Sequence, residues 1–256
     1  MDYCQIIDLV HSTKEIILDG SESLKVTEKG PSDFVTQIDF NVQDYMIKEL
    51  KLINPLIQVI AEEKDNQKID FSKPVWILDP IDGTTNLVHG YHHSAVSLAL
   101  HDGEKIAFGV VYNPYADETF HAEAGKGCYL NNKRMQVSKV GALKDSLVMV
   151  GTASYYKELA DEIFTEIFRV YRRCGDIRRT GSAALDLAYV ACGRVEGYFE
   201  RNLKPWDIAA GMLLVKEAGG IVSGYSGEEM TLDTINDIVS DNGEIHEEFI
   251  NAINVR

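Results

Sequence analysis

Acidic residues stand at the ends of short apolar runs, and their types and spacing suit the binding of hard cations. Asp79 and Asp82 lie three positions apart in Trp76–Asn86, where an apolar run is followed by Asp-Pro-Ile-Asp-Gly-Thr-Thr. A Pro-Ile turn between them would let both carboxylates converge on one point, and Mg²⁺ prefers such oxygen ligands. Gly83 permits close backbone approach, so the amides that follow it predict a phosphate-binding helix start. The segment therefore indicates metal ions held between carboxylates and a phosphate.

Further acids support this interpretation, although each also has a structural explanation. A lone Asp-x-x-Asp-Gly is common in turns and helix caps. Glu62 ends the preceding apolar run, so we expect it to meet Asp79 at one sheet edge. Asp207 begins an apolar helix, where the helix dipole alone favours an acid. Asp39 lies one turn into another helix. The combination favours chemistry with metal ions.

The overall charge narrows the classes of partner. The 256 residues carry a formal net charge of −15, with 45% hydrophobic and 25% charged residues. A globular chain this acidic lacks the basic surface of a protein that binds nucleic acid or an anionic membrane. If its substrate is a small anion, a bound metal must reverse the local field.

The cysteines and the N-terminal segment indicate the cellular compartment in which the protein is expected. Four cysteines occur without the spacing of a zinc site or a disulfide scaffold, and we expect reduced thiols in a cytoplasmic protein. Residues 1–20 carry acids where a signal peptide is basic, so we expect neither a targeting nor a membrane segment. The cysteines are Cys4, Cys128, Cys174 and Cys192.

The elements that must position the acids begin with helices. Ile6, Val10 and Ile17 predict one amphipathic helix near the N-terminus. A second helix is predicted over Asp33–Ile53, with Asp33 as its N-cap. We then expect strands at Leu56–Ala61, Val75–Leu78, Ser94–Leu100 and Ile106–Tyr112. The last two form a hairpin closed by Asp102-Gly103, and this hairpin starts an antiparallel meander.

The pattern changes near residue 141, beyond which helices and short strands alternate. We expect one catalytic domain over residues 1–256, with an α+β half at about 1–140 and an α/β half at 141–256. Gly193 is expected to end one of the helices in a left-handed conformation. The predicted elements are a strand at Leu147–Val150, helices at Tyr155–Arg172 and Ser182–Cys192, a strand at Val195–Glu200 and a helix at Trp206–Ala218.

Longer motifs, in order along the whole chain, resemble those of the inositol monophosphatase family. The first family signature resembles Trp76–Asn86, and the second resembles Pro205–Gly211 followed by Glu217–Gly220. Asp33–Asp39 is similar to a third motif, and Arg178–Ala188 is similar to bacterial members in particular. The resemblance implies a layered sheet–helix sandwich of the sugar-phosphatase type, with the catalytic site between two halves. It also implies dependence on Mg²⁺, inhibition by lithium, and a homodimer.

Position by position, the family pattern implies a site with two Mg²⁺ ions and a third, weaker ion shared by Glu62. Glu62, Asp79 and the backbone carbonyl of Ile81 would hold the first ion. The second would be held by Asp79, Asp82 and Asp207. Thr84, oriented by Asp39 and Glu62, would position the attacking water. The substrate and its phosphate would meet Asp82, Gly83, Thr84, Ser182, Ala183, Glu200 and Asp207.

The implied activity is hydrolysis of inositol monophosphate to inositol and phosphate by a metal-activated water. Glu200 matches the family contact to an inositol hydroxyl, yet it would suit other polyols too. The same chemistry on NADP(H), fructose 1,6-bisphosphate, histidinol phosphate or another sugar phosphate is the alternative. A regulatory binding protein without turnover would be expected to have lost a metal ligand, and none is lost. Phosphatases with an aspartate nucleophile place their acids two positions apart, unlike Asp79 and Asp82.

Two further clusters have simpler explanations. His89, His92 and His93 suggest zinc, but we interpret them as a solvated loop after the catalytic turn, because the other candidate ligands are hard oxygens. Four arginines would steer an anion or contact a second subunit, with surface ion pairing as the default. They are Arg172, Arg173, Arg178 and Arg179. A small phosphorylated alcohol is the expected partner, without nucleic acid or membrane.

Overall fold

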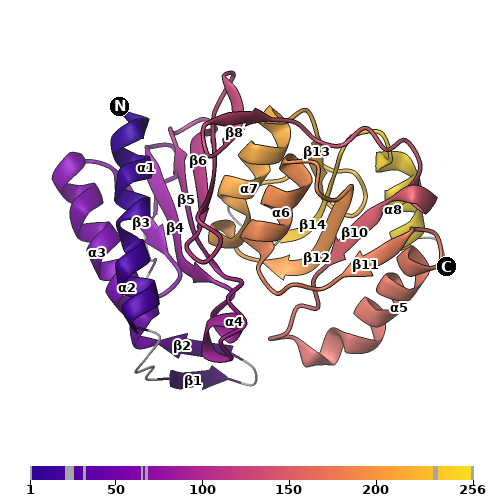
Figure 1. Cartoon of the computed structure of the whole chain (residues 1–256), viewed down its shortest axis with the longest axis horizontal. Coiled ribbons are helices and arrows are strands. Elements are labelled where there is room, and N and C mark those ends of the chain that lie inside the picture. Colours follow the sequence, from indigo (N-terminus) through magenta and orange to yellow (C-terminus); the bar gives the residue numbers. More distant parts are fainter. Residues whose placement is uncertain are drawn as a thin grey trace.

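The computed structural model describes residues 2–20, 26–30, 33–64, 66, 69–232 and 236–254. Two β-sheets stand side by side, with helices between them and on both outer faces (Figure 1). This gives five layers in the order helix, sheet, helix, sheet, helix. The α/β and α+β sandwich predicted from the sequence is therefore confirmed.

The larger sheet has seven strands in sequence order, β3-β4-β5-β6-β7-β8-β9. Only its first pair, β3 and β4, runs parallel, and the rest form an antiparallel meander that confirms the predicted hairpin. The strands are β3 (Gln58–Ala61), β4 (Val75–Asp82), β5 (Ala95–His101), β6 (Ile106–Asn113), β7 (Glu118–Glu123), β8 (Gly127–Leu130) and β9 (Lys133–Met135).

The smaller sheet has five strands in the order β11-β10-β12-β14-β13. Its first three strands are parallel neighbours, whereas β14 pairs antiparallel with both β12 and β13. The strands are β10 (Leu147–Val150), β11 (Asp176–Arg178), β12 (Gly197–Leu203), β13 (Ile221–Ser223) and β14 (Asn236–Asp241). A separate ribbon pairs β1 (Val26–Gly30) with β2 (Asp33–Thr36).

The helices enclose three apolar cores, one on the outer side of each sheet and one between the sheets. The central layer is α6 (Ala183–Ala191) and α7 (Pro205–Glu217), which pack against each other. The larger sheet is covered outside by α1 (Tyr3–His11), α2 (Thr13–Gly20) and α3 (Gln37–Ile53), and the smaller by α5 (Ala160–Tyr171) and α8 (His246–Asn254). The short α4 (Thr84–Val88) follows β4.

The N-terminal helices depart from the sequence prediction in two places. The single amphipathic helix is instead α1 and α2, separated at Ser12, although Ile6, Val10 and Ile17 are buried as predicted. The next helix begins at Gln37, because Asp33–Thr36 is strand β2 and Asp33 is not the N-cap. Thr36 takes that place, since its hydroxyl accepts hydrogen bonds from the first-turn amides in a capping box with Asp39.

Strand β4 is longer than predicted. It continues through Asp79 to Asp82, with an irregularity in its pairing with β5 between these residues, where we expected a turn after Leu78. The parallel pairing of β3 with β4 places Glu62 and Asp79 at one sheet edge, which confirms that expectation.

Bounds in the second half of the chain shift by a few residues. Helix α5 starts at Ala160 instead of Tyr155, and β12 extends past Glu200 to Leu203. Strand β10 matches its prediction, and Gly193 follows α6 with a φ of 71°, as expected for a left-handed helix end. The four cysteines carry free thiols. Among the described residues, no helix is long and apolar enough to cross a membrane.

Close packing of α6 on α7 depends on Gly211. A Cβ added there would lie 2.5 Å from both Cβ and Cδ1 of Leu187, which is too close for any rotamer change of Leu187 to relieve completely. The two helices can therefore approach only because this position lacks a side chain. Since both helices begin at the site described below, their spacing sets its width.

We expect Gly211→Ala to lower the free energy of unfolding by about 1–2 kcal/mol, because the steric overlap exceeds the gain in helix propensity. Thermal or denaturant unfolding measures this change. Gly141→Ala is the matched control, because a Cβ at Gly141 meets nothing within 4 Å. Equal stability of the two variants would contradict the proposed role of Gly211.

Candidate active site

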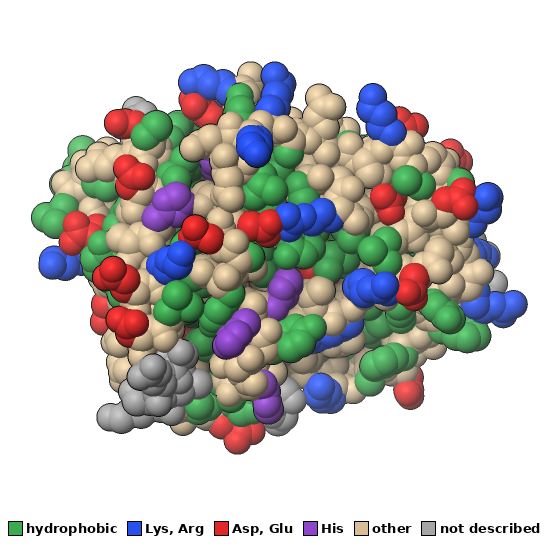
Figure 2. Space-filling model, viewed as in Figure 1, with side chains coloured by type: hydrophobic (Ala, Val, Ile, Leu, Met, Phe, Trp, Pro, Cys, Tyr) green, Lys and Arg blue, Asp and Glu red, His purple; other side chains and the backbone are tan. Residues whose placement is uncertain are grey.

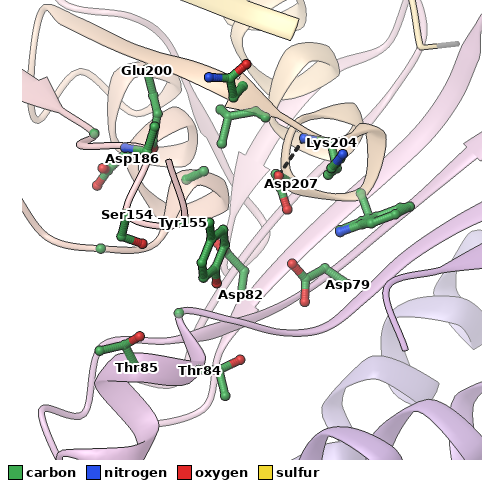
Figure 3. Close-up of a pocket in the computed structure, with 18 of the residues that line it drawn as sticks. Asp79, Asp82, Thr84, Thr85, Ser154, Tyr155, Asp186, Glu200, Lys204 and Asp207 are labelled. Carbon is green, nitrogen blue, oxygen red and sulfur yellow. Dashed lines mark hydrogen bonds between the residues drawn. The ribbon is translucent and has the colours of Figure 1, made fainter. Parts of the chain in front are cut away.

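A pocket of about 330 Å³ lies where the two sheets and the central helices meet (Figure 3). Its acidic side chains come from separate elements: Asp79 and Asp82 from β4, Glu200 from β12 and Asp207 from α7. Most of the residues predicted for the site line it, namely Glu62, Asp79, Ile81, Asp82, Gly83, Thr84, Ala183, Glu200 and Asp207. Asp39 and Ser182 lie just behind this lining and contact it through hydrogen bonds.

Thr84 is held by Asp39, as predicted from the family pattern. The Thr84 hydroxyl lies 2.9 Å from Asp39 Oδ1 and 3.0 Å from the Ile81 carbonyl oxygen. Asp39 Oδ2 accepts hydrogen bonds from the amide and hydroxyl of Thr36. Asp39 is fully buried, and burial raises the pKa of its carboxyl group in spite of these donors. The hydroxyl proton of Thr84 is therefore directed away from the pocket, which leaves its oxygen free to accept.

Asp79 is one of the strongly perturbed acids of the pocket. Its side chain is 2% exposed, and burial followed by the charges of Glu62, Asp82 and Asp207 raises its pKa well above the usual value. One of its oxygens accepts a hydrogen bond from the amide of Ile81 at 2.9 Å. Asp79 therefore lies close enough to Glu62, Asp82 and Asp207 for their charges to act on its carboxyl group.

Asp82 connects the two halves of the chain. Its Oδ2 accepts the Ser182 hydroxyl at 2.5 Å and the Ala184 amide at 2.7 Å, both at the start of α6. Burial raises the pKa of Asp82 to about 6, while the hydrogen bond from Ser182 opposes this shift. Ser182 also caps α6, because its oxygen accepts from the amide of Leu185. Ser182 is thus the N-cap at the predicted start of this helix, and the same hydroxyl orients Asp82.

Asp207 lies in the first turn of α7, and its Oδ2 accepts a hydrogen bond from the Lys204 amide at 2.7 Å (Figure 3). Burial, and then the charge of Asp82, raises its pKa well above the usual value. The positive end of the helix dipole partly offsets this effect. The structure therefore brings Asp207 into the electrostatic field of Asp82 and Asp79, across the gap between the sheets.

These acids form an all-oxygen donor set with excess negative charge, which suits hard divalent cations such as Mg²⁺ and not zinc. Across the described residues, no group of three or more His, Cys, Asp or Glu side chains stands in a metal-ligating arrangement. The carboxylates share one pocket and raise one another's pKa values, although they do not converge on a single point as the sequence predicted for Asp79 and Asp82.

Glu200 lies at the end of the pocket away from Asp79 (Figure 3). The Tyr198 hydroxyl donates to its Oε2 at 2.6 Å, and the Ala153 amide donates to its Oε1 at 3.0 Å. A Cβ on Gly151 would lie 1.8 Å from its carboxyl carbon, so Gly151 makes room for this side chain. Glu200 is therefore fixed in place in the lining of the pocket.

The predicted phosphate cradle lies where α4 begins. Gly83 adopts a φ of 93° and precedes Thr84, so successive backbone amides start the helix beside the acids. A Cβ on Gly83 would lie 3.1 Å from the carbonyl oxygens of His93 and Gly181, which leaves little room for any larger residue. Gly83 is thus required both by its backbone conformation and by close packing.

The sequence analysis missed several residues that line the pocket. Asp186 was noted only as part of a longer motif, Arg179 only as one of four arginines, and Tyr155 only as a helix boundary. The apolar composition around Asp186 would have signalled it, because a single acid in the otherwise apolar Ala183–Ala191 needs a partner when buried. Trp206, the predicted start of a helix, is half-buried and lines the pocket.

The histidine loop and the arginines lie mostly beside the pocket. His92 stacks on Tyr115, His93 meets the Tyr189 ring edge-on, and His89 is exposed. Burial lowers the pKa of His93, so a neutral ring is expected at pH 7. Of the four arginines in the predicted basic cluster, Arg179 lines the pocket, where its guanidinium donates to the Thr152 hydroxyl.

Known proteins share this architecture. An inositol-1-monophosphatase of Mesorhizobium japonicum is 39% identical over 232 residues, covering 91% of this chain and 87% of that protein. A Nus factor SuhB of Vibrio cholerae is 40% identical over 82% of this chain and 79% of its own length. The solved structure of a Thermotoga maritima IMPase superposes with a TM-score of 0.90 at 36% identity, covering 99% and 97% of the two chains. The model of the inositol monophosphatase family matches residues 3–255, and the chain belongs to this family.

Proposed function

We propose that the chain is a Mg²⁺-dependent phosphomonoesterase that hydrolyses inositol monophosphate to inositol and phosphate. The observation that carries this proposal is the pocket in which Asp79, Asp82 and Asp207 adjoin Thr84 and Glu200. Such a pocket provides metal-binding oxygens, a polarising hydroxyl and a polyol contact in one place. The relative named inositol-1-monophosphatase supports the same substrate. A cytoplasmic location, expected from the cysteines, is part of the proposal.

Glu62, Asp79 and the Ile81 carbonyl would hold one Mg²⁺, and Asp79, Asp82 and Asp207 a second; Glu62 would share a third, weaker ion. Bound Mg²⁺ would neutralise the phosphoryl oxygens, lower the pKa of a water molecule and stabilise the departing alkoxide. The acids of the chain supply the countercharge for these cations. Their residue types match the all-oxygen set that Mg²⁺ prefers.

Thr84 and Asp39 position the attacking water. Because the Thr84 hydroxyl donates toward Asp39 Oδ1 or the Ile81 carbonyl, its oxygen is free to accept a hydrogen bond from a water molecule in the pocket. This hydrogen bond increases the nucleophilicity of the water without a covalent intermediate. The amides of Gly83 and Thr84 then bind phosphoryl oxygens, whose charge the start of α4 favours.

The alcohol portion of the substrate lies toward α6 and β12. Glu200 accepts hydrogen bonds from hydroxyl groups, and the start of α6 at Ser182 and Ala183 forms the adjoining wall. Asp82 and Asp207 lie between this wall and the phosphate. Because the two oxygens of Glu200 are already fixed by Ala153 and Tyr198, hydroxyl binding requires little reorganisation.

A second candidate function follows from the relatives named Nus factor SuhB. It is a binding role toward another macromolecule, alone or beside catalysis. Every acid of the implied metal set is present in this chain, which supports turnover as the primary function. Turnover by purified protein, tested over a panel of inositol, sugar and dinucleotide phosphates, distinguishes a catalyst from a binding protein.

The stability of the protein should depend on both metal ions and pH. Burial raises the pKa of Asp82 from 3.8 to about 6, so the folded state binds more protons than the unfolded state between these values. Stability of the metal-free protein should therefore fall as pH rises through this interval, and Mg²⁺ should restore it. The thermal midpoint with chelator or with Mg²⁺, at about pH 5 and about pH 8, measures both effects.

Asp82→Asn is the matched variant for this experiment. It removes one ionising group, so the decrease of the midpoint with pH and the increase with Mg²⁺ should both become smaller. Turnover should fall by several orders of magnitude, since charge that develops in the transition state loses a countercharge. Full activity of the chelated wild-type protein would refute the metal requirement, and lithium should inhibit the Mg²⁺-loaded enzyme.

The next prediction concerns substrate choice. Glu200→Gln keeps the shape of the side chain but removes its charge, and a charge-assisted hydrogen bond contributes roughly 1.5–3 kcal/mol. We expect kcat/KM for inositol monophosphate to fall by about ten- to a hundred-fold. Phenyl phosphate, which lacks hydroxyl groups, should lose far less. Equal losses on both substrates would show that Glu200 supports the catalytic centre and does not read the polyol.

A homodimer is also part of the proposal. Phe164, Phe168 and Tyr171 form an exposed aromatic stripe along α5, with side chains 59%, 58% and 53% exposed, and Arg172 lies over the Phe168 ring. Figure 2, in the view of Figure 1, shows hydrophobic side chains next to Lys and Arg at the end of the molecule where α5 lies. An exposed aromatic stripe next to cations is typical of protein interfaces.

We expect light scattering at micromolar concentration to give a dimer, and Phe164→Glu with Phe168→Glu to give a monomer. Charge placed in an apolar interface is costly, because it is buried without a partner. Leu56→Glu is the control, since Leu56 is 88% exposed but lies outside α5. A wild-type monomer, or a dimer that survives the double substitution, would refute this interface.

A further inference from the structure

Asp186 is a buried acid in the pocket to which the mechanism above gives no role. It lies in the first turn of α6, is 2% exposed and lines the same pocket as Glu200. Its Oδ1 accepts a hydrogen bond from the Thr180 hydroxyl. Among the described residues, no hydrogen-bond donor is found for Oδ2. A carboxylate oxygen that is nearly buried, borders a cavity and lacks a donor is a position for a ligand hydroxyl.

The charges around Asp186 favour a neutral polyol there. Glu200 and Asp82 repel its charge, whereas Arg179 is the cation that attracts it. Figure 3 shows Glu200 and Asp186 toward one end of the pocket, with Asp79 and Asp207 toward the other. Two carboxylates against one guanidinium would repel a second phosphate, while hydroxyl groups would supply the missing donors.

We propose that Asp186, together with Glu200, reads adjacent hydroxyl groups on the alcohol portion of the substrate. Each carboxylate offers an acceptor from a different element, Asp186 from α6 and Glu200 from β12. A pair of acceptors matches two neighbouring hydroxyls, as in a cyclitol or sugar, better than it matches a single one. This inference rests on the proposed phosphatase function and names the substrate class more narrowly.

The structural alternative is that Asp186 only fixes the loop before α6. Thr180 would then be its one relevant partner, and Oδ1 its one relevant atom. Asp186→Asn retains an acceptor for Thr180 but puts an NH₂ donor in place of the second carboxyl oxygen, the one that faces the pocket without a donor. Thr180→Val does the opposite, because it removes the hydrogen bond and keeps the carboxylate. The two variants therefore separate the two explanations.

The experiment compares kcat/KM for inositol monophosphate with kcat/KM for phenyl phosphate in the Mg²⁺-loaded enzyme. For Asp186→Asn we expect the ratio of the two constants to fall about ten-fold, mainly through KM for inositol monophosphate, because an acceptor for a substrate hydroxyl is lost. For Thr180→Val we expect the wild-type ratio. The thermal midpoint of each variant reports whether it folds.

An unchanged ratio in Asp186→Asn would overturn the proposal, and so would an equal fall of the ratio in Thr180→Val. If Asp186→Asn does not fold, the double variant Asp186→Asn with Thr180→Val is measured in its place, because both substitutions keep the volume of the original side chains. An unchanged ratio in the double variant would then overturn the proposal. Wild-type enzyme that hydrolyses a sugar monophosphate but not inositol monophosphate would refute the proposed substrate. The same ratio measured on that sugar monophosphate would still test Asp186.

Discussion

Repulsion among buried carboxylates is the constraint on which the rest of this structure depends. Asp79 and Asp82 are buried and Asp207 is half-buried, and the three lie in one another's electrostatic field. Each of the three is anchored separately by a backbone amide: Ile81 donates to Asp79, Ala184 to Asp82 and Lys204 to Asp207. Backbone donors do not ionise, so these anchors do not depend on the protonation of a neighbouring side chain.

The two sheets are joined at the same place where the acids gather. Asn86, on α4, donates one amide hydrogen to the His93 carbonyl and one to the Thr180 carbonyl, across 94 residues of sequence in the second case. Asp82 accepts from Ser182 and Ala184 on that same segment. The start of α6 is therefore fixed from the opposite sheet. Any change in the spacing of the sheets would move the groups that orient Asp82.

Local chemistry explains which parts of the fold could be predicted from the sequence. The strand that leads into Glu62, the hairpin with Asp102-Gly103, and the cap at Ser182 all depend on neighbours close in sequence. The hydrogen bond from Ser182 to Asp82 joins residues 100 positions apart, and no local pattern predicts such a pair. Thr36 was overlooked as a helix cap because Asp33 is an equally good cap by residue type. The β2 strand, set by pairing with β1, decides between them.

The acids of the pocket fall into two groups, and we propose that the groups have separate tasks. Those that would bind metal sit in motifs whose spacing reflects the fixed geometry of cations and phosphate. Glu200 and Asp186 lie outside that implied metal set. Tyr198, on the same strand β12, donates to Glu200, and Thr180, in the loop before α6, donates to Asp186. A substitution at these pairs would change the shape of this end of the pocket without disturbing Asp79, so we propose that substrate choice within one catalytic frame depends on α6 and β12.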